Sequence, residues 1–291
     1  MWRFPIDGRA SDNVRNAVRI TRQTGQVQVP SVSPDGTEMV YVSDNGGHSN
    51  LWVAALDGSS VQQITFERDA GVSVALPLWP PVGDRILFLR AHDAQIDICL
   101  VNRDGGAIHT LLPAALGPCW SGDARSVFCS REVGRIERLD LATGAIAPVR
   151  SDRAIGPAAP RDGGALYFTR PPELSLGPGG YSEICRATPE DGPSHVLARV
   201  ATSRVPLARR LHVHVTVSPD GRWLAVPLLD STTANLWLIP TDGGPMRAVT
   251  DFDDRSVFIA RSVAWSPDSS HLYAAVADTE ADIVLLEGLL G

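Results

Sequence analysis

The stretch Ser33-Pro34-Asp35-Gly36 recurs as Ser218-Pro219-Asp220-Gly221 and, in altered form, as Ser266-Pro267-Asp268-Ser269. Each copy is followed by a short apolar segment of the kind that forms a buried strand. Proline fixes φ, while Asp and Gly suit the positions that close a tight turn, so each copy predicts a turn that leads into a β-strand. A motif that recurs with the same continuation indicates a structural repeat.

Two of these units continue into a second shared pattern. The segment 50–53, which reads Asn-Leu-Trp-Val, is followed by an Asp-Gly pair and by Ile64-Thr65. The segment 235–238, which reads Asn-Leu-Trp-Leu, is followed by an Asp-Gly pair and by Val249-Thr250. An Asp-Gly pair between two apolar runs is a hairpin signal. Each unit therefore predicts four strands: one on each side of the first turn, one carrying the Trp, and one after the hairpin.

The spacing of the repeat sets the architecture. One anchor per unit gives intervals of 47, 41, 39, 58 and 48 residues, close to one sixth of the 291-residue chain. The anchors are Ser33, Pro80, Ser121, Pro160, Ser218 and Ser266. Four-stranded units at this period are typical of β-propellers. We therefore predict an all-β fold, a six-bladed β-propeller of four-stranded antiparallel blades that occupies residues 1–291 as a single domain.

The turn, the Asn-Leu-Trp strand and the Asp-Gly hairpin together resemble the WD40-like repeat of TolB-type β-propellers, a family with six blades. The resemblance covers essentially the whole chain, and the first, fifth and sixth repeats match it well. Three central repeats depart from it, because Val82 replaces the turn Asp, and Gly122 and Arg161 replace the turn Pro. Propellers of this type often follow a sensor, a winged helix-turn-helix or a kinase module. The resemblance thus implies that the chain is a fragment of a longer multidomain bacterial protein.

A propeller leaves two open sheet edges unless strands from both ends of the chain complete one blade. Residues 2–8 resemble the third strand of a repeat, and residues 282–286 resemble one too. The outer strand of the closing blade is expected near residues 18–21. One third-strand candidate is then surplus, so either residues 1–9 overhang the blade or the chain is a piece of a longer protein.

Composition excludes several classes of activity. All 26 basic residues are Arg, so the chain has no Lys for a Schiff base, a phosphate loop or a kinase-type site. The net charge of −7 argues against nucleic acid as a partner. No apolar stretch is long enough to span a membrane. Residues 1–25 are rich in charge and lack the apolar run of a signal peptide, which favours the cytoplasm, while a missing upstream region would leave the periplasm open.

The sequence contains no strong catalytic motif and implies no cofactor. The four cysteines lack a metal-binding or disulfide framework and are expected to be small buried hydrophobes, with a Cys119–Cys129 disulfide as the sharper alternative. His212 and His214 alternate on one predicted strand and could face a common ligand. They define one alternative, a metal-dependent lyase acting on a polysaccharide fragment. The other alternative is the substrate-gating propeller of a prolyl-oligopeptidase-like peptidase that lacks its hydrolase domain.

The leading hypothesis is a non-catalytic, monomeric scaffold that binds a protein or peptide. Loops that join second to third strands, and loops that leave fourth strands, emerge on one face of a propeller, and such loops commonly carry recognition. The recurring tryptophans, by contrast, are expected to lie in the core. The candidate binding residues on the loops are Arg22, Asp44, His48, Arg68, Asp69, Arg90, His92, Asp93, Asp230, Asp253 and Arg255.

Overall fold

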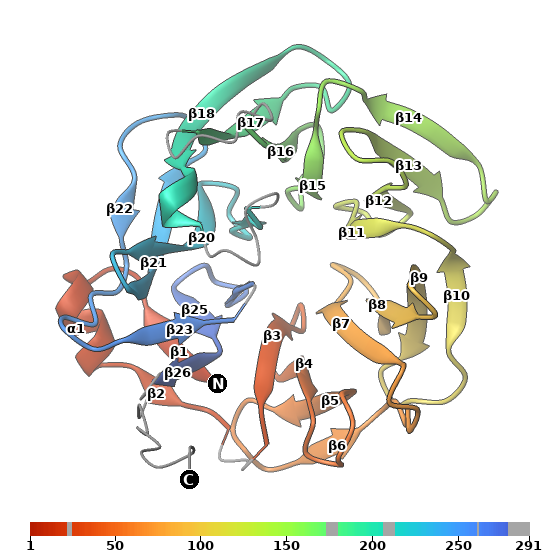
Figure 1. Ribbon diagram of the computed structural model, residues 1–291, viewed down its shortest axis with the longest axis horizontal. Coiled ribbons are helices and arrows are strands. Elements are labelled where there is room, and N and C mark those ends of the chain that lie inside the picture. Colours follow the sequence, from red (N-terminus) through yellow and green to blue (C-terminus); the bar gives the residue numbers. More distant parts are fainter. Residues whose placement is uncertain (22–24, 173–179, 206–212, 261, 279–291) are drawn as a thin grey trace, which may run out of the picture.

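The computed structural model describes residues 1–21, 25–172, 180–205, 213–260 and 262–278. These residues form six four-stranded antiparallel blades arranged in a ring (Figure 1), which confirms the predicted all-β, six-bladed fold. In each blade the first strand lies nearest the central axis and the fourth strand lies at the rim.

The first three blades follow one another along the chain, each built from four consecutive strands. Blade 1 contains β3 (Val27–Val32), β4 (Glu38–Ser43), β5 (Asn50–Ala55) and β6 (Val61–Gln63). Blade 2 contains β7 (Ser73–Leu78), β8 (Arg85–His92), β9 (Gln95–Asn102) and β10 (His109–Leu112). Blade 3 contains β11 (Leu116–Trp120), β12 (Ser126–Ser130), β13 (Ile136–Asp140) and β14 (Ile146–Arg150).

Blades 4 and 5 continue this order, and blade 6 combines both ends of the chain. Blade 4 contains β15 (Ile155–Ala158), β16 (Leu166–Arg170), β17 (Tyr181–Ala187) and β18 (Ser194–Ala201), followed by the 3-10 helix η1 (Thr202–Arg204). Blade 5 contains β19 (Thr216–Val217), β20 (Trp223–Asp230), β21 (Thr233–Pro240) and β22 (Arg247–Ala248). Blade 6 contains β24 (Ala264–Trp265), β25 (His271–Ala274), β1 (Trp2–Pro5) and β2 (Val18–Arg19), with the short pair β23 (Val257–Ile259) and β26 (Val276–Asp278) and the helix α1 (Ala10–Arg15) beside it.

The repeated turn is held by one Ser and one Asp side chain. In blade 1 the Ser33 hydroxyl donates to Asp35 Oδ1 at 2.6 Å and accepts from the Glu38 amide at 3.0 Å. Asp35 also accepts from the Thr37 amide at 3.0 Å, and Gly36 has a φ of 73°. The same Ser–Asp arrangement recurs in three other blades, at Ser121 and Asp123, Ser218 and Asp220, and Ser266 and Asp268. The side-chain network, more than the proline, therefore specifies the turn.

Blade 3 shows this directly, because its turn has Gly122 in place of Pro and Ala124 in place of Gly. Ala124 takes a φ of 58°, in the left-handed region where glycine is favoured. The turn keeps its geometry because Asp123 still accepts hydrogen bonds from Ser121 and from the Arg125 amide.

The Asn-Leu-Trp pattern also has a structural cause. In blade 1 the Thr65 hydroxyl donates to Asn50 Oδ1 at 2.9 Å and accepts from the Leu51 amide at 2.8 Å. Both polar side chains are buried, so these bonds satisfy groups that water cannot reach. Asn235 and Thr250 make the equivalent bond in blade 5, at 3.1 Å. In blades 1 and 5 this pair fixes the chain just after the fourth strand to the third strand and so sets where the following loop starts.

The two ends of the chain close the ring through backbone pairing. β1 pairs with β25 over four residues, from Trp2 opposite Ala274 to Pro5 opposite His271, and β2 then pairs with β1 at the rim. The predicted closure by terminal strands is thereby confirmed. Residues 2–5 are the third strand of blade 6 and not an overhang, because they pair with β25 over four residues on one side and with β2 over two residues on the other. The other candidate, residues 282–286, lies outside the described residues.

Apolar faces of neighbouring blades pack against one another and bury most of the core. Phe88 of blade 2 and Val40 of blade 1 share one cluster, for example, and Tyr167 of blade 4 and Leu224 of blade 5 share another. Among the described residues there is no helix with the length and apolar character needed to cross a membrane.

The left-handed backbone at Ala124 gives a stability prediction. We expect Ala124→Gly to raise the free energy of unfolding by roughly 0.5–1 kcal/mol, because relief of about 1–2 kcal/mol of left-handed strain exceeds the added entropy of glycine in the unfolded chain. Ala142→Gly, at an exposed position without a positive φ, should instead lower that free energy by roughly 0.4–1 kcal/mol. Urea denaturation of both variants measures the difference, and equal effects would contradict this account of the turn.

Candidate functional site

The propeller presents two chemically different faces. We call the face that carries the loops after second and fourth strands the loop face, and the face that carries the Ser–Asp turns the turn face. Every candidate residue predicted from the sequence that the structure describes belongs to the loop face, because each lies at the end of a second or fourth strand or in the loop that follows it. Arg22 falls outside the described residues.

Buried side chains hold the loop between blades 1 and 2 in place. The Asn50 amide group donates to the Glu67 carbonyl at 3.1 Å, and the Glu67 amide donates to Asn50 Oδ1 at 2.8 Å. Glu67 in turn accepts from Arg90 through Nε at 2.6 Å and Nη2 at 3.3 Å. A bidentate pair of this kind fixes both side chains. Arg90 of blade 2 is therefore held by Glu67, which lies in the loop that leads from blade 1. The exposed Arg68 follows Glu67 in that loop, whose backbone is fixed at Glu67 by Asn50.

His92 is held by a buried carboxylate that the sequence analysis missed. Its Nε2 lies 2.9 Å from Asp97 Oδ2, and Asp97 is 5% exposed. The hydrogen bond to Asp97 raises the pKa of His92 above its usual value. Burial pushes the pKa of Asp97 upward, but hydrogen bonds from His92, Gln95 and the Ala114 amide outweigh burial and hold that pKa below its usual range. A polar residue inside an otherwise apolar strand was the signal that could have identified Asp97.

A cavity of about 270 Å³ with mixed polar and apolar lining opens between blades 1 and 2. Asp44 lines it and accepts a hydrogen bond from the Gln26 amide at 2.7 Å. Amide and hydroxyl side chains supply most of the remaining polar lining, from Gln26, Gln28, Ser43, Ser49 and Ser73. These groups both donate and accept hydrogen bonds, which matches the needs of a polypeptide backbone.

A second group of candidate residues lies in blades 5 and 6. Asp230 accepts from Arg204 at 2.5 Å and from the Trp237 indole at 3.0 Å. Arg255 donates to Asp278 at 2.6 Å. Asp253 is exposed and has a φ of 52°.

The structure thus brings the candidate residues together in two groups rather than one. The blade 1–2 group contains Asp44, His48, Arg68, Asp69, Arg90, His92 and Asp93, and the blade 5–6 group contains Asp230, Asp253 and Arg255. Many of the charges already have partners within the fold. The exposed carboxylates of the first group, such as Asp69 and Asp93, leave it mixed in charge.

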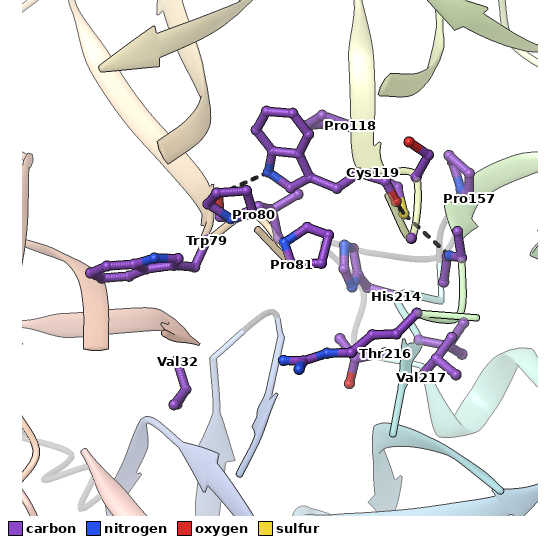
Figure 2. A pocket seen from close by; sticks show the side chains of 18 residues that line it. Val32, Trp79, Pro80, Pro81, Pro118, Cys119, Pro157, His214, Thr216 and Val217 are labelled. Atoms are coloured by element: carbon purple, nitrogen blue, oxygen red, sulfur yellow. Dashed lines mark hydrogen bonds between the residues drawn. The ribbon is translucent and has the colours of Figure 1, made fainter. Parts of the chain in front are cut away.

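The turn face carries a pocket that the sequence analysis did not predict. It has a volume of about 190 Å³ and is lined by the ends of the innermost strands of five blades (Figure 2). Two of the tryptophans expected in the core, Trp79 and Trp120, line this pocket, and Trp79 is only half-buried. His214 also lines the pocket, while His212 lies outside the described residues. A Trp immediately before the repeated turn was the available signal, since that position ends a strand next to the axis.

The cysteines are free thiols, as expected, and no Cys119–Cys129 disulfide forms. Burial raises the pKa of the Cys119 thiol to about 12 and those of Cys129 and Cys185 to about 11. Thiolate is the nucleophilic form, so these groups are inert at neutral pH. Within the described part of the chain, no three His, Cys, Asp or Glu side chains are grouped as metal ligands would be.

Comparison with protein families gives a partial match. The family model of the dipeptidyl peptidase IV N-terminal region matches residues 2–103. An uncharacterized protein of Agrobacterium fabrum (strain C58) is 30% identical in an alignment 119 residues long that covers 36% of this chain and 40% of that protein. The match thus spans about two fifths of that curated relative.

Solved structures share the whole fold. A TolB-like protein from Agrobacterium tumefaciens has a TM-score of 0.67 at 18% identity, over 96% of this chain and 98% of its own. TolB from Acinetobacter baumannii has a TM-score of 0.63 at 14% identity, over 82% of this chain and 61% of its own. Other propellers, including a chain of a nidogen–laminin complex, oligogalacturonate lyases and a prolyl endopeptidase, give TM-scores of 0.51 to 0.59. The resemblance to TolB-type propellers is confirmed as a likeness of fold.

The His92–Asp97 pair predicts a specific pH response. Because the folded-state pKa of His92 lies above the unfolded value of about 6.5, the pair stabilises the fold fully below that value and loses this contribution as pH rises through the folded pKa. We expect Asp97→Asn to lower the midpoint of the His92 imidazole titration, followed by NMR. The stability difference between variant and wild type should shrink at higher pH.

Asp191→Asn is the control, since Asp191 is an exposed carboxylate in the loop between β17 and β18. It should leave the His92 titration unchanged. A His92 midpoint that does not respond to Asp97→Asn would show that the pair has no electrostatic role.

Proposed function

We propose that this protein is a non-catalytic, monomeric propeller that recognises a protein or peptide partner on its loop face, at blades 1 and 2. The observation that carries this proposal is the cavity of about 270 Å³ beside Asp44, which has a mixed polar and apolar lining. The buried Asn50 side chain holds the loop between blades 1 and 2 next to it. Preorganised loops lower the conformational entropy lost on binding, which favours recognition.

The lining chemistry supports a polypeptide ligand. Gln28, Ser49 and Ser73 offer neutral donors and acceptors, as an extended backbone requires, and Asp44 offers one carboxylate. The exposed Arg68 and Asp69 nearby present both signs of charge, which would fix the register of a charged partner. The blade 5–6 group, with Asp230, would form a second contact area for a large partner.

The comparisons support a binding scaffold more than an enzyme. Similarity is higher to TolB chains, at TM-scores of 0.63 and 0.67, than to lyase or endopeptidase propellers, at 0.51 to 0.53. One similar propeller is part of a nidogen–laminin complex, which is an assembly of proteins. We also propose that the propeller acts as the interaction module of a longer bacterial protein, as TolB-like repeats suggest. The lyase and peptidase-gating alternatives gain no specific support from the described residues.

A peptide selection tests this function. Random peptides displayed on phage should yield a family of sequences that bind the immobilised full chain, with affinities confirmed by calorimetry. Ser73→Phe places a large ring at an exposed position that lines the cavity, and it should weaken a selected peptide by about tenfold or more.

Ser60→Phe is the matched control, because it makes the same change at an exposed position of the hairpin between β5 and β6 on the turn face. It should leave peptide affinity unchanged. Selected peptides that bind wild type, Ser73→Phe and Ser60→Phe equally would place recognition elsewhere. Failure of any selection to enrich a binding sequence would contradict the peptide-binding function.

A further inference from the structure

The second position of the six repeated turns lies around the axis on the turn face, and its residue type differs in one blade. Five of these positions carry uncharged residues, namely Pro34, Pro81, Gly122, Pro219 and Pro267. The sixth, in blade 4, is Arg161. Blade 4 therefore has a positively charged side chain at a turn position where the other five blades have proline or glycine.

Arg161 lines the turn-face pocket together with Trp79, Trp120 and His214 (Figure 2 labels Trp79, His214 and the surrounding prolines). The described residues give its guanidinium no hydrogen bond, no ion pair and no aromatic ring contact. The described lining of this pocket contains no carboxylate either. Partial desolvation lowers the pKa of Arg161, while the residue as a whole remains exposed, so a ligand can reach it from solvent. Two other arginines on the same face are paired, Arg103 with Glu38 and Arg138 with Glu190.

The backbone that carries Arg161 is fixed against blade 3. A Cβ atom on Gly122 would lie only 2.4 Å from the Arg161 carbonyl oxygen and 2.6 Å from that of Pro160, so only glycine allows this approach. The Ala159 amide donates to Cys119 Sγ at 3.2 Å, which ties the same two blades together. Trp120 donates from its indole to the Leu78 carbonyl at 3.2 Å and fixes the opposite wall. The pocket is therefore formed before any ligand binds.

We infer that this pocket binds a carboxylate attached to a compact apolar group, with the Arg161 guanidinium as its counter-ion. A single guanidinium matches the single charge of a carboxylate and can bind it through two parallel hydrogen bonds. Phosphate carries more charge and usually engages several donors. The Trp and Pro lining suits an apolar body, and about 190 Å³ accommodates one residue-sized group rather than a drug-sized molecule.

Two sources offer this chemistry. The carboxyl end of a polypeptide supplies the charge and an apolar side chain within one residue, and a small free carboxylic acid supplies both in one molecule. The site lies on the face opposite the loop-face cavity. It is therefore a second binding site, and it can be tested independently of the peptide recognition proposed above.

The experiment compares three probes on the full chain: the tripeptide Ala-Ala-Phe with a free carboxylate, the same tripeptide as its C-terminal amide, and 3-phenylpropionate. Binding is followed by NMR through the indole N–H signals of Trp79 and Trp120, assigned with Trp→Phe variants. We expect at least one of the two acids to shift both indole signals. The amide should bind more weakly by a factor of about ten or more, since it cannot form the charge-assisted hydrogen bonds between a carboxylate and a guanidinium. A response to the tripeptide acid alone assigns a chain end, and a response to phenylpropionate assigns a small acid.

Variants at Arg161 test its role. Arg161→Gln should reduce binding of the acid to the level of the amide, and Arg161→Lys should give an intermediate affinity because it keeps the charge without the planar fork. Arg125→Gln is the matched control, as its side chain is 85% exposed in the neighbouring turn of blade 3. Ser73→Phe should leave acid binding unchanged, which separates this site from the loop-face cavity.

Three results would overturn the inference. They are equal binding of acid and amide, equal binding by wild type and Arg161→Gln when circular dichroism shows both folded, and no response to either acid at the two indoles. Inorganic phosphate shifting these signals while both carboxylates leave them unmoved would likewise overturn it.

Discussion

The pairing of β1 with β25 is the contact on which the ring depends, because it joins strands from opposite ends of the chain. Each of the other five blades is assembled from a continuous stretch of sequence, so local turns and hairpins suffice to specify it. Blade 6 instead requires that both chain ends meet, at the entropic cost of closing a very long loop. Once it forms, blade 6 lies between blades 5 and 1, with β24 in contact with β19 on one side and with β3 on the other.

Closure also explains why the two faces carry different chemistry. A closed ring fixes the innermost strands around one axis, so their first residues and last residues converge on opposite faces. The turn face is formed by the repeated turns, so its residue types are similar from blade to blade, with prolines and apolar residues around the axis. The loop face follows the least repeated parts of the sequence, where Glu67 and Asp97 meet side chains from other strands. Variation is thus concentrated on the loop face, with Arg161 as the conspicuous exception on the turn face.

Much of the fold could be predicted because its specifying interactions are local in sequence. Ser33 and Asp35 meet within one turn, and Asn50 and Thr65 meet within one hairpin, so the pattern itself reports them. The turn in blade 3 survives without Pro and Gly because the Ser121–Asp123 bond remains. By contrast, the repeat predicted only the face of the propeller on which the candidate loop residues lie. It predicted neither their hydrogen-bonding partners nor their division into two groups.

The interactions that sequence reasoning missed depend on burial or on contacts with a neighbouring blade. Asp97 was overlooked because a single acid in an apolar strand looks like an edge residue until its burial is known. Trp120 is buried in a core cluster, as expected, whereas Trp79 is only half-buried. Both also line the axial pocket, which was not predicted because strand alternation does not distinguish the axis from the space between blades. The role of Gly122 depends on the backbone of the next blade, which no local pattern encodes.

The exclusive use of arginine has a consequence for how the charge of the protein varies with pH. Lysine would normally lose its charge near pH 10 and cysteine would gain one near pH 8.5, but this chain has no lysine and burial raises the pKa of all four thiols. Burial also raises the pKa of Tyr167 and Tyr273. Its 26 guanidinium groups stay protonated throughout this range. The electrostatic field of the folded ring is therefore nearly constant in alkaline solution, and its charge changes mainly on the acid side, where histidines and carboxylates titrate.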